Sequence, residues 1–99
     1  MIELTTAGFP LIGGRMDTID GRPVPVQVFH RRAHVISLVA IPMPGSHDDG
    51  AAAVSASRDG YLVLGWKGQD FRYEAIADVS RAELTSFVSV WRSQSHALP

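Results

Sequence analysis

The stretch FHRRAHVISL, residues 29–38, gathers the side chains of this sequence that are best suited to chemistry, two histidines around two arginines. Imidazoles bind metal ions and move protons near neutral pH. On a helix, His30 and His34 would lie one turn apart, as the first two ligands of a zinc protease do. In an extended chain the same side chains would instead surround a turn. The chemistry of the stretch therefore depends on the elements that hold it.

The hydrophobic pattern on both sides of this stretch favours a β-hairpin. Residues 23–30 alternate between apolar and other side chains, and a second apolar run begins at His34. Residues 31–33 then form the loop, and the two histidines could face each other across the strand pair. A functional zinc site needs a third protein ligand, and no nearby Glu or Cys supplies one. The sequence predicts a turn without a metal; a small ligand- or metal-binding module at His30 and His34 is the alternative hypothesis.

The other candidates for catalysis or binding have structural explanations. None of the nine serines lies in a Gly-x-Ser-x-Gly elbow. Asp48 and Asp49 lack the ligand spacing and the distal Glu of a calcium loop. Gly13 and Gly14 match no phosphate-binding pattern and precede no helix. We therefore expect no enzymatic activity, no cofactor and no metal. The polar residues that remain without a structural explanation form a candidate interaction surface: Arg15, His30, Arg31, Arg32 and His34.

Length and composition indicate one globular domain. The chain has 99 residues, of which 45% are hydrophobic and 19% are charged. A formal net charge of −1 argues against a nucleic-acid partner, because such proteins carry an excess of Lys and Arg. The absence of cysteine excludes disulfides and thiolate metal sites. No apolar run approaches the ~20 residues that a membrane helix needs, so we expect a soluble chain as given.

The order of the elements predicts an α+β fold, an antiparallel meander of about five strands with one C-terminal helix packed on one face. Ser80 and Glu83 have the spacing of a capping box, which places the helix start there. We treat residues 1–99 as a single domain with a folded core at 8–91. The expected strands cover residues 13–19, 23–30, 34–41, 60–66 and 71–77. The apolar stripe of the helix consists of Leu84, Phe87, Val88 and Trp91.

Two segments are expected to be less ordered. Residues 42–57 contain prolines, glycines and small side chains, which predict a flexible loop with at most a poor strand near Val54. Residues 92–99 lie after the apolar stripe and are expected to fray.

The strand at 34–41 is apolar on both faces, although one helix covers only one face of a sheet. Three features could cover the other face: curl of the sheet, the N-terminal segment, or a second subunit in a two-fold homodimer. Pro23 and Pro25 each remove a backbone donor, which predicts that their strand has an unpaired side near its start.

Four stretches, taken in order, resemble one family. They are GFPLIGGRMDTIDGRPVPVQVFHRRAHVISLVAIP (8–42), GYLVLGW (60–66), DFRYEAIAD (70–78) and DVSRAELTSF (78–87). Together they are similar to the extracytoplasmic, C-terminal domain of membrane-spanning anti-sigma factors that restrain extracytoplasmic-function sigma factors. The chain departs from the family pattern where a Trp usually stands near Tyr73 or Glu74.

This resemblance implies a protein in three parts: a cytoplasmic zinc-binding clasp for the sigma factor, one membrane span, and this domain on the periplasmic side of the bacterial inner membrane. No His-x-x-x-Cys-x-x-Cys motif occurs here, so neither zinc binding nor sigma-factor binding falls on any residue of this chain. The resemblance implies a non-catalytic sensor or regulatory domain. Its implied partner is a regulatory protein or protease outside the membrane.

Overall fold

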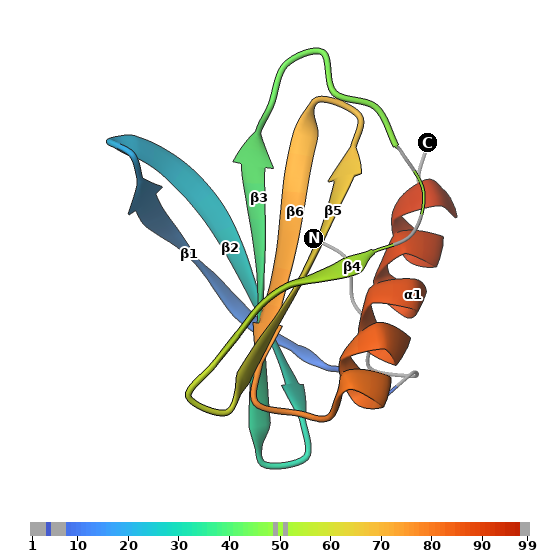
Figure 1. The fold of residues 1–99 in the computed structure, drawn as a ribbon. Helices are drawn as coiled ribbons and strands as arrows, with labels where there is room; N and C mark the ends of the chain where they lie inside the picture. The colour runs from blue at the N-terminus through green and yellow to red at the C-terminus, as the bar shows by residue number, and fades with distance from the viewer. Residues whose placement is uncertain (1–3, 5–7, 49, 51, 98–99) are drawn as a thin grey trace.

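The computed structural model describes residues 4, 8–48, 50 and 52–97. It confirms the α+β class, an antiparallel sheet with the C-terminal helix packed on one face (Figure 1). The elements are β1 (Leu11–Ile19), β2 (Arg22–Arg31), β3 (His34–Pro42), β4 (Ala53–Arg58), β5 (Tyr61–Gly68), β6 (Phe71–Ala77) and α1 (Arg81–Ala97). No helix in the described part of the chain is long and apolar enough to cross a membrane.

The sheet has six strands rather than five, and their order is not a simple meander. The additional strand is β4, most of which lies in the segment 42–57, where we expected a flexible loop with at most a poor strand near Val54. The order is β1-β2-β3-β6-β5-β4, so β3 pairs with β6 and not with the next strand along the chain. β6 thereby becomes a central strand, while β4, with its small side chains, lies at the edge.

Tight turns join β1 to β2, β2 to β3 and β4 to β5. Asp20 and Gly21 both have positive φ, 52° and 76°, and Asp59 and Gly60 have 52° and 81°. Two consecutive positive φ values are typical of the type I′ turn, whose twist matches that of a hairpin. The turn between β2 and β3 contains Arg32 at φ 56°. The hairpin interpretation of FHRRAHVISL is therefore confirmed.

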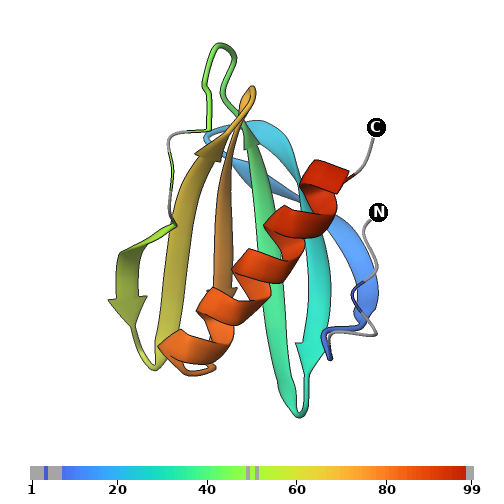
Figure 2. The same ribbon diagram turned by 90° about the vertical axis from the view of Figure 1, so that its right-hand side faces the viewer.

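The main core lies between the sheet and α1, which crosses one face of the sheet diagonally (Figure 2). Phe87 of α1 contacts the rings of Phe9 and Phe29 edge-on, with centroids 5.3 and 5.0 Å apart. Leu4 and Phe9 are also buried in this core, so the described N-terminal residues pack on the helix side. The predicted stripe of Leu84, Phe87, Val88 and Trp91 is buried as expected.

A second, smaller core covers the opposite face of the sheet. Val24 and Val26 are each 1% exposed and pack with Val39. β2 pairs with β3 only from Val26 onward, so the start of β2 and its partner β1 swing away from β3 and curl over that face (Figure 1). Pro23 and Pro25 lie in this region, which β3 leaves unpaired. Sheet curl therefore covers Val39 and Ile41 on the second face of β3, whereas Val35, nearer the hairpin turn, is 44% exposed.

Two expectations about order need correction. The helix runs to Ala97, so residues 92–97 of the tail that we expected to fray are helical; residues 98–99 lie outside the described residues. The segment 42–57 contains β4 and is also tied to the β5–β6 turn, because the backbone amide of Asp70 donates to the carbonyl oxygen of Ser46 at 3.0 Å.

Candidate functional site

The β2–β3 hairpin does not bring its two histidines together. His30 pairs with Val35, whereas His34 pairs with Arg31. Paired residues share a face and consecutive residues alternate, so His30 and His34 lie on opposite faces of the sheet. Among the described residues, no group of three or more His, Asp or Glu side chains is placed to hold a metal ion.

Arg31 and His34 instead link the hairpin to neighbouring elements. The Arg31 Nε donates to Glu83 Oε2 at 3.2 Å, and its guanidinium lies 5.3 Å from the centre of the Phe9 ring. The His34 Nδ1 lies 2.9 Å from Asp78 Oδ1, just beyond the end of β6. These contacts give both side chains a structural role.

Arg15 and Arg32, the remaining two residues of the expected interaction surface, lie apart from each other. Arg15 pairs with Val26, which precedes His30 by four residues in β2. At roughly 3.3 Å per residue, the backbone of Arg15 therefore lies about 13 Å from that of His30 along the strand. Its guanidinium is 3.2 Å from Asp17. Arg32 is exposed in the turn. The five predicted residues therefore do not form one continuous site.

A cavity that the sequence did not reveal lies where β5 turns into β6. Its volume is about 330 Å³, and its walls include Trp66 of β5, Tyr73 of β6 and Trp91 of α1. From sequence, Trp66 was predicted only as a residue of the strand at 60–66, and Trp91 only as part of the apolar stripe of the helix. They are 4% and 6% exposed, but their remaining surface faces this cavity.

The three rings form a closely packed wall. Trp66 and Tyr73 are stacked, with centroids 5.5 Å apart and planes at 21°. Trp91 lies 5.0 Å from Tyr73 and 5.9 Å from Trp66, and its Nε1 donates to Gln27 Oε1 at 3.3 Å. Burial raises the pKa of the Tyr73 phenol above its ordinary value of 10.0, so the hydroxyl remains protonated at neutral pH. The wall is therefore rigid and uncharged.

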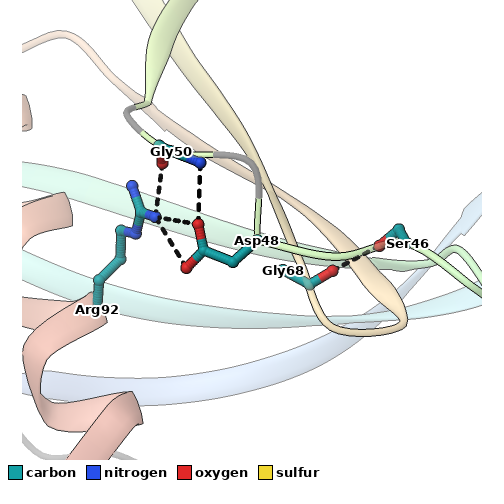
Figure 3. A network of polar contacts seen from close by, with 5 residues as sticks. All are labelled: Ser46, Asp48, Gly50, Gly68 and Arg92. Carbon is teal, nitrogen blue, oxygen red and sulfur yellow. Dashed lines mark hydrogen bonds and ion pairs between the residues drawn. The ribbon is translucent and has the colours of Figure 1, made fainter.

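Two residues that line the cavity, Asp48 and Arg92, form an ion pair (Figure 3). The Arg92 guanidinium nitrogen lies 3.1 and 3.3 Å from the two carboxylate oxygens of Asp48 and donates to the Gly50 carbonyl at 2.7 Å. The Gly50 amide donates to the same carboxylate at 3.0 Å. The guanidinium also lies 5.9 Å from the centre of the Trp66 ring. The charge of Asp48 is thus balanced within the protein.

The segment that carries Asp48 is fixed to the β5–β6 turn. The Ser46 hydroxyl contacts the Gly68 carbonyl (Figure 3) and lies 3.2 Å from that of Phe71. The Gly45 amide donates to the Asp70 carboxylate at 3.0 Å. These bonds hold one end of the cavity in place. The sequence could not indicate that Asp48 and Arg92 form an ion pair, because the two residues are 44 positions apart. In addition, Asp48 lies in a segment that was expected to be a loop, and Arg92 lies in a tail that was expected to fray.

No protein-family model matches the chain, and no curated protein or solved structure was found to match it. The function must therefore be argued from the geometry together with the resemblance in the motif residues.

Proposed function

We propose that the chain is a non-catalytic regulatory domain of a transmembrane anti-sigma factor, and that it lies on the periplasmic side of the membrane, where it receives a signal. The resemblance of four stretches, in order, to that family is the starting point. It extends over β1 to β3, β5, β6 and the first turns of α1.

The observation that carries the proposal is that the motif residues build the fold. Gly8 has a φ of 88°, a conformation that suits glycine. Phe9 and Trp66 are buried in the core, and Asp20 with Gly21 forms a turn. Structural roles for the motif residues are what a non-catalytic regulatory domain predicts.

The ionisable side chains of the hairpin motif support the same conclusion. Arg31 is paired with Glu83, and His34 with Asp78. Each pair spans two elements, so its first effect is to position the hairpin against α1 or β6. Under this proposal, a signal that shifts the hairpin would also act on α1 and on the end of β6 through these pairs.

The family arrangement places the membrane span before the domain. Under this proposal the N-terminal residues connect the span to the core, in which Leu4 and Phe9 are 2% and 3% exposed. A signal that alters the helix-side core would then reach the membrane through this segment.

The test begins with the gene. We expect the full reading frame to encode a membrane helix before this segment, and a sigma-factor gene to lie beside it. A reporter driven by that sigma factor should become constitutively active, or lose its response to envelope stress, when the codons for residues 8–97 are deleted. A full-length protein with Ser86→Ala, at an exposed helix position, serves as the control and should behave as wild type. Absence of the membrane helix and the sigma-factor gene, or a reporter unaffected by the deletion, would refute the proposal.

A further inference from the structure

The residues just before β1, 8–10, have few backbone contacts with the sheet. In the part of the chain that the structure describes, one backbone hydrogen bond joins them to it, from the His30 amide to the Pro10 carbonyl oxygen at 2.9 Å. The Phe9 amide donates instead to Leu4, within the same N-terminal part of the chain. Because β1 is an edge strand, the release of residues 8–10 breaks no bond between two strands. Segments with so few backbone bonds are those that open locally in folded proteins.

Side chains hold these residues in place. Phe9 is 3% exposed, and its ring contacts that of Phe87 in α1 edge-on at 5.3 Å. The Arg31 guanidinium lies 5.3 Å from the centre of the Phe9 ring, and its Nε donates to Glu83 at the start of α1. The same guanidinium is so close to Gly8 that a Cβ there would lie 2.7 Å from Nη1. Arg31 therefore contacts residues 8 and 9 while it is bound to α1.

We propose that residues 8–10 open from the helix-side core as a unit separate from the sheet, and that Arg31 is the latch that keeps this unit closed. Opening removes Phe9 from the core and uncovers the ring of Phe87, while the pairing of β2, β3, β6, β5 and β4 is retained. This inference goes beyond the proposed function, because it concerns a conformational equilibrium of the chain itself.

Native-state hydrogen exchange, measured by NMR on the 99-residue chain, tests whether the opening exists. The His30 amide reports on it directly, because its acceptor is the Pro10 oxygen. We expect this amide to exchange at least about tenfold faster than the slowest amides of β3 and β6, after correction for intrinsic rates. The urea dependence of its exchange should be less than about half of theirs, because the opening exposes only part of the buried surface. A rate or a urea dependence equal to theirs would mean that His30 is released only by global unfolding, and would overturn the inference.

Two variants test the latch. Arg31→Met removes the guanidinium from the Phe9 ring and should accelerate exchange of the His30 amide by about fivefold. Arg32→Met is the matched control at the neighbouring position, because Arg32 is exposed and has no ion pair or hydrogen bond with any described residue. Its exchange should stay within about twofold of wild type. No acceleration in Arg31→Met, or an equal one in Arg32→Met, would overturn the role of Arg31. None of these rates bears on the gene context or the reporter result, so the two proposals fail independently.

Discussion

Glu83 forms an ion pair with Arg31 that joins the β2–β3 hairpin to the first turn of α1. The sequence predicts Glu83 as one arm of a capping box with Ser80. One half of the box is present, since the Glu83 amide donates to Ser80 Oγ at 3.1 Å. The Glu83 carboxylate, however, is engaged by Arg31. One residue thus serves both the local start of the helix and a tertiary contact.

Ser80→Ala should lower the free energy of unfolding by about 1 kcal/mol, because the first turn of α1 loses the acceptor for the Glu83 amide. Urea unfolding monitored by circular dichroism measures the change. Ser86→Ala, at an exposed position within the same helix, is the control and should be neutral or stabilising by a few tenths of a kcal/mol through helix propensity. Equal effects of the two substitutions would contradict the assignment of the cap.

Gly68→Ala should lower the free energy of unfolding by about 1–3 kcal/mol, because a Cβ there would lie 2.7 Å from Tyr73 Cε2 and the Tyr73 ring is held by Trp66 and Trp91. Gly13→Ala is the matched control in β1, where a Cβ meets nothing within 4 Å. Thermal unfolding of the two variants compares them. A Gly68→Ala protein as stable as Gly13→Ala would show that the aromatic wall is looser than the structure indicates.

At the scale of elements, α1 is attached to the sheet through its apolar stripe and, at its far end, through Trp91 and Arg92. Trp91 contacts both Trp66 of β5 and Tyr73 of β6, and it donates to Gln27 of β2. Arg92 connects the same turn of the helix to the segment before β4. These contacts hold α1 in place as far as Arg92, the first residue of the tail that was expected to fray.

Trp91→Ala should lower the free energy of unfolding by about 3–5 kcal/mol, since it removes a large side chain that is only 6% exposed and leaves a void beside two other rings. Denaturant titration gives the value. Trp91→Phe retains a ring but loses the hydrogen bond to Gln27, so its loss should be clearly smaller. If both variants were as stable as the wild-type protein, α1 would not pack on the sheet as described.

At the scale of the whole molecule, the curl of the sheet creates two cores on opposite faces. The larger core lies under α1, and the smaller is enclosed between the β1–β2 hairpin and strands β3 and β6. One helix is sufficient for this fold because the sheet covers much of its own second face. On this second face, Val39 and Ile41 of β3 thus find partners within one chain, whereas Val35 is 44% exposed.

We expect the chain to be monomeric at tens of micromolar, because Val24, Val26 and Val39 are already buried without a second copy. Analytical ultracentrifugation over a range of concentrations tests this. A sedimentation coefficient that rises with concentration would contradict the expectation and would identify an association through surface other than this cluster.

The sequence by itself determined the local features: the alternating strands, the hairpin loop at 31–33, the cap at Ser80 and the apolar stripe that ends at Trp91. Each depends on residues close together in the chain, where propensity and periodicity act directly. Only the tertiary structure decided which strand lies beside β3, because β3 and β6 are separated by the β4–β5 hairpin. It also decided the structural role of Arg92 and Asp48. Their ion pair forms only because the C-terminal part of α1 and the loop before β4 meet in the folded chain. The aromatic cavity depends on three elements that are adjacent only after folding, so no pattern along the chain could have indicated it.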